Sequence, residues 1–147
     1  RRSVDAFAAR ARPRGVTLEV EARPATVAGD EDRLRQLVLN LLDNAVRHAS
    51  SRVRVEVEDD GPDVRLRLDD DGPGVPEAQR EHVFERFYRV DRARQRDDGG
   101  SGLGLAIVRA LAEAHGGTVR VDGSPLGGAR FEVRLPRASG VEGGPTP

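Results

Sequence analysis

Two asparagines and an arginine follow one another at helical spacing near residue 40. Asn40, Asn44 and Arg47 are four and three residues apart, so on a helix they share one stripe. Carboxamide oxygens at this spacing can coordinate a hard cation directly or through water, and Mg²⁺ usually takes phosphate oxygens as further ligands. An arginine one turn later can meet a phosphate. The same residues are also compatible with the polar edge of an ordinary amphipathic helix.

An acidic, glycine-rich segment follows a predicted strand at residues 69–76. A carboxylate at the end of a strand, here Asp70, can accept a hydrogen bond from an adenine amino group. Gly72 and Gly74 have no side chains, which allows a base to approach the backbone. Taken alone, the segment is equally well explained as an ordinary acidic turn.

A third cluster consists of glycines that precede a predicted helix, at Gly100, Gly102 and Gly104. Such glycines leave the first N–H groups of the helix open to an anion, and the helix dipole adds about 0.3–1 kcal/mol at an exposed site. A dinucleotide-binding fingerprint has similar glycines but follows a strand. Here a long polar segment, residues 88–100, comes first, and such segments are typical of lids and binding loops.

The elements that would position these residues can be predicted from the pattern of apolar residues. Residues 30–49 repeat apolar side chains at three- and four-residue intervals, which predicts an amphipathic helix. The other expected elements are strand 16–21, the hairpin strands 53–58 and 64–68, a short helix at 77–87, helix 103–115, and strands 118–122 and 129–135. We therefore expect an α+β fold of two layers, with a mixed, mostly antiparallel sheet and about three helices on one face.

Composition excludes several classes of protein. The chain has 147 residues, 24 basic and 25 acidic, with a net charge of −1, which does not favour nucleic-acid binding. All its basic residues are arginine, so it has neither a Walker phosphate-loop lysine nor the strand lysine of a eukaryotic-type protein kinase. The absence of cysteine excludes disulfides and thiolate chemistry. No apolar run approaches the ~20 residues of a transmembrane helix.

In this order, the motifs resemble those of the ATP-binding catalytic domain of bacterial sensor histidine kinases, which has the Bergerat fold. The resemblance covers residues 16–135 and rests on five motifs in sequence: an asparagine box at 33–45, a first glycine box at 70–74, a phenylalanine box at 84–89, a second glycine box at 102–108 and a last one at 127–131. It implies a linker or the end of a dimerisation region at 1–14, the ATP-binding domain at 15–137 and a flexible tail at 138–147.

The resemblance assigns roles to the predicted asparagine helix. Asn44 would hold Mg²⁺ with the assistance of Asn40. Arg47 stands where the family often has a phosphate-contacting lysine, and these three residues would be the catalytic ones. His48 stands where an aromatic residue or a histidine commonly flanks the nucleotide.

The resemblance also assigns the surroundings of ATP. Asp70 would accept a hydrogen bond from the adenine amino group, and Gly72 and Gly74 would line the site. Phe84 and Phe87 would anchor a lid on the core. Around the phosphates, the implied ATP-binding residues are Gly100, Gly102, Leu103, Gly104, Leu105 and Arg109. Arg92, Arg94 and Arg96 are further candidates for phosphate contact, and the sequence does not choose among them.

The resemblance implies a kinase that lacks its own acceptor. The three histidines have neither the acidic residue nor the Thr-Pro that commonly follow the family's phosphoacceptor. Some ATPases of the superfamily carry a water-activating glutamate at the Asn40 position, and asparagine cannot accept that proton near neutral pH. The γ-phosphate would therefore go to a histidine on a separate dimerisation domain, and then to a response regulator.

Further expectations concern the parent protein and the alternatives. We expect a cytoplasmic domain, monomeric as a fragment, from a homodimeric parent, and a membrane anchor in that parent is compatible with the sequence. Two other functions remain open at this point: an anti-sigma-type protein-serine kinase of the same fold, and a non-catalytic nucleotide-binding switch. An acceptor histidine on an upstream dimerisation helix would distinguish the first of these from a histidine kinase.

Overall fold

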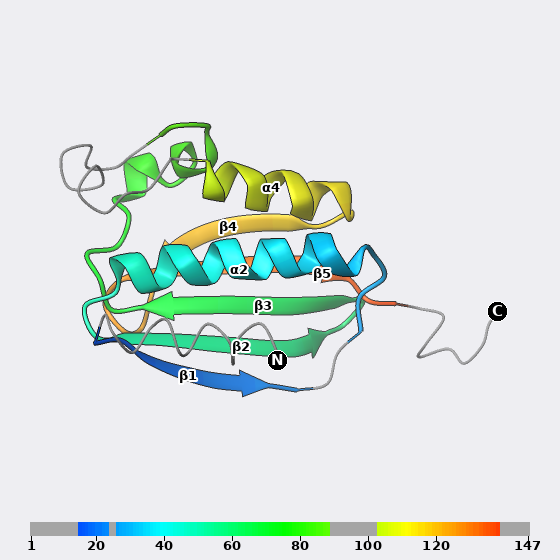
Figure 1. The fold of residues 1–147 in the computed structure, drawn as a ribbon, viewed down its shortest axis with the longest axis horizontal. Coiled ribbons are helices and arrows are strands. Elements are labelled where there is room, and N and C mark those ends of the chain that lie inside the picture. Colours follow the sequence, from blue (N-terminus) through cyan, green and yellow to red (C-terminus); the bar gives the residue numbers. More distant parts are fainter. Residues whose placement is uncertain (1–14, 24–25, 89–102, 139–147) are drawn as a thin grey trace.

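The structure, a computed structural model, describes residues 15–23, 26–88 and 103–138. It has two layers, a five-stranded sheet and a layer of helices on one of its faces (Figure 1). The elements are β1 (Thr17–Ala22), α2 (Glu31–His48), β2 (Arg52–Asp60), β3 (Asp63–Asp70), two 3₁₀ helices (Glu77–Gln79 and His82–Phe84), α4 (Gly104–Ala114), β4 (Thr118–Gly123) and β5 (Ala129–Pro136). This architecture confirms the expected α+β sandwich.

The sheet has the strand order β1-β2-β3-β5-β4. Strands β1 and β2 are parallel, and the other three pairs are antiparallel. The parallel pair arises because α2 lies between β1 and β2 in the chain, and parallel neighbours need such a crossover. The tight turn at Gly61, whose φ is 66°, makes β2 and β3 a hairpin. The prediction of a mixed, mostly antiparallel sheet is therefore confirmed.

Helix α2 is well determined by its sequence. Asp30 caps it, because its carboxylate accepts hydrogen bonds from the N–H groups of Asp32 (2.9 Å) and Arg33 (3.2 Å). Its buried side chains form the predicted apolar stripe: Leu37, Leu41, Leu42, Ala45 and Val46. The helix ends at His48, after which Ala49 is extended.

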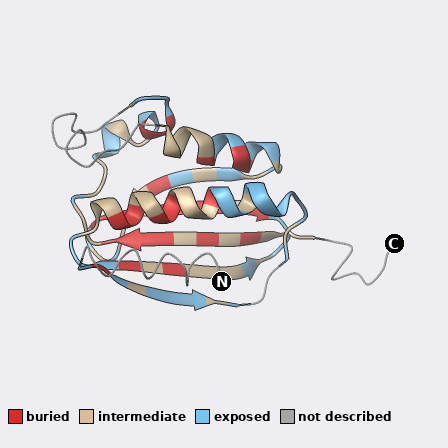
Figure 2. Cartoon of the chain, viewed as in Figure 1, coloured by how far each residue is buried: buried red, intermediate tan, exposed pale blue. Residues whose placement is uncertain are grey.

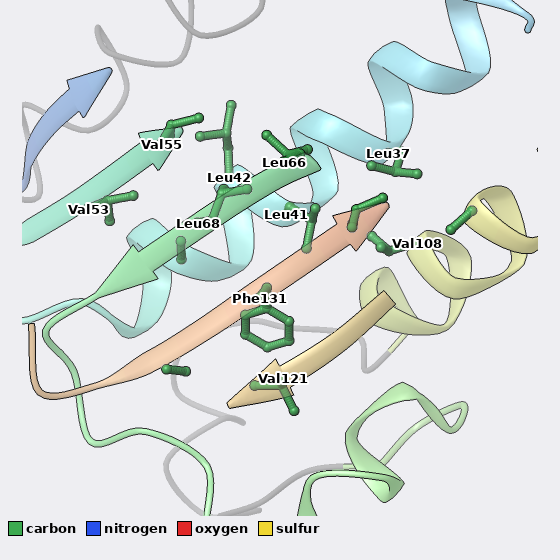
Figure 3. Packing of buried hydrophobic residues seen from close by; sticks show 14 of the residues in the cluster. Leu37, Leu41, Leu42, Val53, Val55, Leu66, Leu68, Val108, Val121 and Phe131 are labelled. Carbon is green, nitrogen blue, oxygen red and sulfur yellow. The ribbon is translucent and has the colours of Figure 1, made fainter. Parts of the chain in front are cut away.

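The core lies between the helices and the sheet (Figures 2 and 3). Strand side chains alternate between the two faces, so every second residue of β2, β3 and β5 meets α2 or α4. The labelled side chains in Figure 3 come from these elements and from β4: Leu37, Leu41, Leu42, Val53, Val55, Leu66, Leu68, Val108, Val121 and Phe131. Helices α2 and α4 also pack against each other. Neither α-helix in the described ranges is long and apolar enough to cross a bilayer.

The two helices are also joined by a histidine. His115 follows α4, and its Nε2 accepts a hydrogen bond from the Asp30 N–H (3.2 Å) while its Nδ1 donates to the carbonyl oxygen of Leu111 (2.8 Å). A side chain at Gly29 would meet this ring, since a Cβ there would lie 2.2 Å from it. The joint fixes the start of α2 against the end of α4.

One expected element differs. Residues 77–87 were expected to form a helix, but they form the two 3₁₀ helices instead, so the described part of the chain has two α-helices where about three were expected. The helical backbone stops because Glu85 is extended, with ψ of 146°, and Phe87 has a positive φ of 63°. Neither conformation is compatible with a continuous α-helix, whose residues have φ and ψ both negative.

Candidate functional site

Asp70 is the last residue of β3 and faces the helices. Only 2% of its surface is exposed. Its Oδ1 accepts hydrogen bonds from the N–H groups of Gly72 (2.9 Å) and Ala129 (3.2 Å). All the hydrogen bonds that the described residues give this carboxylate go to Oδ1, which leaves Oδ2 available to an external donor. Burial raises the pKa of Asp70, although the two N–H groups and the nearby His48 oppose the shift.

Glycines bring three backbone segments close to this carboxylate. A Cβ at Gly128 would lie 2.2 Å from Asp70 Oδ1 and 2.6 Å from the Gly72 nitrogen. A Cβ at Gly72 would lie 2.1 Å from the carbonyl oxygen of His48. Gly74 has a φ of 76° and packs next to Gly128. The loop after β3 is thus held between the end of α2 and the turn before β5, and side chains at these positions would separate the segments.

The stripe on α2 lies where the sequence placed it. Asn40, Asn44 and Arg47 are on one helix, and all three side chains are partly buried. Two of their nitrogens, Asn40 Nδ2 and Arg47 Nε, are buried and have no hydrogen-bond partner among the residues that the structure describes. Buried donors are rarely left in this state unless a ligand or water completes them. Two such donors on one face therefore fit an oxygen-rich group such as a phosphate.

Arg47 already has one acidic partner. Its Nη2 lies 2.5 Å from Oδ2 of Asp43, one turn earlier on α2. About half of the Asp43 side chain is exposed, whereas Arg47 is 23% exposed. Asp43 is therefore the ion-pair partner of the expected phosphate contact.

The end of α2 and the loop after β3 meet directly. The contact between Gly72 and the carbonyl of His48 places the glycine loop against the last turn of the helix. His48 is also close enough to Asp70 for its charge to lower the pKa of the carboxylate. The structure therefore brings together the Asn40–His48 segment and the Asp70–Gly74 segment, which are separated in sequence by β2 and β3.

The second glycine box is only partly described. Leu103, Gly104 and Leu105 are partly buried and begin α4, which has neither a side-chain cap nor an acidic residue in its first turn. Arg109 is exposed and pairs with Glu113 on the same helix (3.3 Å). Gly100, Gly102 and the arginines between residues 88 and 100 lie outside the described residues. Among the described residues, nothing joins Arg109 to the α2 stripe.

The phenylalanine box differs between its two members. Phe84 is buried, and its ring packs edge-on against Phe131 of β5 with centroids 6.1 Å apart. Phe87, whose φ is positive at 63°, is 64% exposed. Phe84 therefore packs on the core, whereas Phe87 lies on the surface of the described structure, and the role of both as lid anchors stays a prediction.

Two features of this site were missed in the sequence. Gly128 and Ala129 approach Asp70 from 58 and 59 residues away, and the last glycine box at 127–131 did not indicate this contact. Asp71 was treated as part of an acidic turn. Its carboxylate instead accepts hydrogen bonds from the backbone of residues 50–52. Neither contact follows from local pattern, because both depend on how separate segments meet.

The site and fold define a class of protein. Residues 29–139 match the family of histidine kinase-, DNA gyrase B- and HSP90-like ATPases. This range covers most of the chain and includes both α2 and the loop after β3. The chain belongs to this ATPase family.

Within the family, the similar proteins are sensor histidine kinases. The chain is 41% identical over 131 residues to the sensor histidine kinase CpxA of Klebsiella pneumoniae and 43% identical over 134 residues to BaeS of Escherichia coli. Each match covers 89% of this chain and 29% of the relative, so the chain spans less than a third of these proteins. It corresponds to their ATPase domain.

Solved structures agree with this assignment. The mycobacterial sensor histidine kinase MprB has a TM-score of 0.78 at 35% identity, over 92% of this chain and 94% of that chain. Full-length ShkA in complex with AMPPNP also has a TM-score of 0.78 at 35% identity, over 93% of this chain and 29% of that chain. The fold is therefore that of a histidine kinase catalytic domain.

Proposed function

We propose that the chain binds Mg²⁺-ATP between the C-terminal half of α2 and the loop after β3. The observation that carries this proposal is the buried Asp70 carboxylate, whose Oδ1 is held by two N–H groups while Oδ2 receives no hydrogen bond from the described residues. An adenine amino group is a donor of the kind that Oδ2 requires. The glycines around Asp70 would allow the flat base to reach it.

The phosphates would lie along the stripe of α2. The orphaned Nε of Arg47 and Nδ2 of Asn40 supply donors for phosphate oxygens. Asn44 and Asn40 also have carboxamide oxygens, the kind of ligand that Mg²⁺ accepts, and rotation of an amide exchanges its oxygen and nitrogen. A bound Mg²⁺ would neutralise charge on the phosphate oxygens. The residues present therefore fit the nucleotide and its metal.

We propose further that the γ-phosphate goes to a histidine on a dimerisation domain of the parent protein. The phosphorus–oxygen bond to ADP would break as a phosphorus–nitrogen bond forms, and the imidazole would lose its proton. The similarity to sensor histidine kinases supports this acceptor over a serine. The parent would then act as a homodimer with its ATPase domain in the cytoplasm and pass the phosphate to a response regulator.

Binding is tested by titrating the 147-residue chain with a non-hydrolysable ATP analogue, with and without Mg²⁺, by calorimetry. We expect saturable binding with one nucleotide per chain that is tighter with Mg²⁺. A chain that is folded by circular dichroism and takes up no nucleotide at millimolar concentration would contradict the proposal.

Phosphoryl transfer is tested on the parent protein with radiolabelled ATP. We expect label that is lost in acid and kept in base, as phosphohistidine chemistry requires, and we expect Asn44→Ala to abolish it. Acid-stable label would instead indicate a serine kinase. Nucleotide binding without any labelling of the parent would indicate a nucleotide-binding switch.

A further inference from the structure

Asp71, next to the proposed adenine contact, has its carboxylate surrounded by donors. Oδ1 accepts from the N–H groups of Ser50 (2.8 Å), Ser51 (2.9 Å) and Arg52 (3.0 Å), and Oδ2 accepts from the Ser51 hydroxyl (2.7 Å). The Asp71 N–H donates to the Arg52 carbonyl oxygen (3.3 Å). Desolvation opposes ionisation, but these hydrogen bonds are stronger in sum and hold the pKa of Asp71 well below its usual range.

The position of these donors in the fold is informative. Residues 50–52 connect the end of α2 to the start of β2. Asp71 itself lies between Asp70, whose carboxylate is in the site, and Gly72, which packs on the carbonyl of His48. The Asp71 side chain therefore fastens the loop after β3 to the segment that follows α2. It joins the proposed adenine side of the site to the proposed phosphate side.

We infer that Asp71 is a positioning residue for nucleotide binding, which sets the distance between the Asp70 carboxylate and the α2 stripe. This inference rests on the proposed function. A nucleotide that contacts both segments requires their separation to be fixed in advance, and binding weakens when the protein must reorder them on each encounter. Without the Asp71 carboxylate, the four donors would face water and the loop would move relative to α2.

A second carboxylate provides a matched control. Glu132 on β5 is 3% exposed and accepts hydrogen bonds from Arg67 (2.8 Å) and Arg134 (3.1 Å). Its pKa is also lowered, because these arginines outweigh its desolvation. Its neighbours Phe131 and Val133 face the core, so Glu132 lies on the opposite face of the sheet from the site. Removing it should affect stability and leave the site unchanged.

The experiment compares Asp71→Ala, Asp71→Asn, Ser51→Ala and Glu132→Gln with the natural chain. Each protein is titrated with ATP analogue and with the corresponding GTP analogue, in Mg²⁺, at a temperature where thermal scans show it fully folded. Guanine presents a carbonyl oxygen where adenine presents its amino group, so the ratio of the two affinities reports how well Asp70 is placed. A role in stability alone would leave this ratio unchanged.

We expect Asp71→Ala to weaken binding of the ATP analogue by about tenfold or more, because the loop loses the hydrogen bonds that fasten it to residues 50–52, and to reduce the preference over the GTP analogue. Asp71→Asn keeps an acceptor for the backbone donors and should bind within about threefold of the natural chain. Ser51→Ala should have a smaller effect than Asp71→Ala. Glu132→Gln should lower the melting temperature and leave both affinities unchanged.

The outcomes separate this inference from the proposed function. Normal binding and normal base preference by folded Asp71→Ala would overturn the inference while the proposed function stands. If Glu132→Gln weakened binding as much as Asp71→Ala, the effect would reflect general stability and the inference would again fail. A natural chain that binds neither nucleotide would overturn the proposed function and the inference with it.

Discussion

Asp69 and Asp70 are adjacent carboxylates that face opposite sides of the sheet. Asp69 pairs with Arg130, whose Nε lies 2.7 Å from Asp69 Oδ1. The Asp69 side chain is almost completely buried on that face of the sheet. Asp70 pairs with no arginine in the described part of the chain, although the nearby His48 lowers its pKa slightly. Burial has the larger effect and raises the pKa of Asp70. The two environments assign different roles. Asp69 stabilises the sheet, and Asp70 remains available for a ligand.

Asp70→Asn should separate binding from stability. The change removes a charged acceptor, and a charge-assisted hydrogen bond of ~1.5–3 kcal/mol corresponds to a loss of about ten- to a hundredfold in affinity for the ATP analogue. Because the folded-state pKa is raised, the ionised carboxylate costs the folded state free energy at neutral pH, and asparagine removes that cost. The melting temperature should therefore not fall. Normal nucleotide affinity in this variant would contradict the role of Asp70.

Asp43→Asn should strengthen binding. The carboxylate of Asp43 holds Arg47 Nη2 at 2.5 Å and would compete with a phosphate for the same guanidinium. A pair at this helical spacing contributes only ~0.3–0.5 kcal/mol, so we expect an affinity gain of about twofold that shrinks at high salt. Calorimetry at two ionic strengths measures it. Weaker binding would mean that Asp43 orients Arg47 productively.

The sequence predicted the residues of the site better than their contacts. Helical periodicity alone placed Asn40, Asn44 and Arg47 on one stripe, and the glycine motif identified Asp70. The contact of Asp70 with Ala129 is different, because it joins the Asp70 carboxylate to an N–H group 59 residues away, through a sheet pairing that no local pattern encodes. The exposed Phe87 was also unpredictable, since aromatic residues rarely adopt a positive φ.

At the scale of elements, regular patterns were reliable and short ones were not. The helix predicted at residues 30–49 is α2, because its apolar stripe and its Asp30 cap both indicate a helix over this range. The alternating strands and the hairpin were also confirmed. Residues 77–87 instead form two 3₁₀ helices. A segment this short has few hydrogen bonds of its own, so its tertiary contacts decide its conformation.

The turn before β5 should be intolerant of side chains. In Gly128→Ala, the new Cβ would lie 2.2 Å from Asp70 Oδ1 and 2.5 Å from the Asp70 carbonyl oxygen. We expect destabilisation of about 1–3 kcal/mol, together with weaker nucleotide binding, because the β3 loop must shift. Urea unfolding measures the first and calorimetry the second.

Gly104→Ala is the control for this prediction, since a Cβ there meets nothing within 4 Å and lies in a helix. Its stability should be equal to that of the natural chain or higher. If Gly128→Ala were as stable as this control, the close packing of the turn against Asp70 would be refuted.

For the whole molecule, the two faces of the sheet have opposite characters. The face toward the helices is apolar, whereas the other carries arginines and carboxylates in register, including the buried Glu132 and Asp69. This second face is stabilised by ion pairs that need ionised carboxylates. It explains how a chain that is 33% charged residues still folds around one core.

The ion-pair network predicts loss of stability in acid. The pKa values of Glu132 and Asp71 are lowered in the folded state, so the stability they contribute is complete above their ordinary values of 4.5 and 3.8 and is lost as the pH falls below them. The pKa of Asp70 is raised instead, so its protonation in acid stabilises the folded state and offsets part of this loss. Thermal unfolding by circular dichroism across this pH range should show a falling midpoint, and Glu132→Gln should show a shallower fall. A flat profile would refute the contribution of the network.

The central claim is that a purine nucleotide bridges α2 and the loop after β3. A crystal structure of the chain with Mg²⁺ and a non-hydrolysable ATP analogue tests it most directly. The account predicts the adenine amino group within hydrogen-bond distance of Asp70 Oδ2, with the metal and phosphates beside Asn44 and Arg47. A nucleotide bound elsewhere, with Asp70 still enclosed by protein atoms alone, would contradict it.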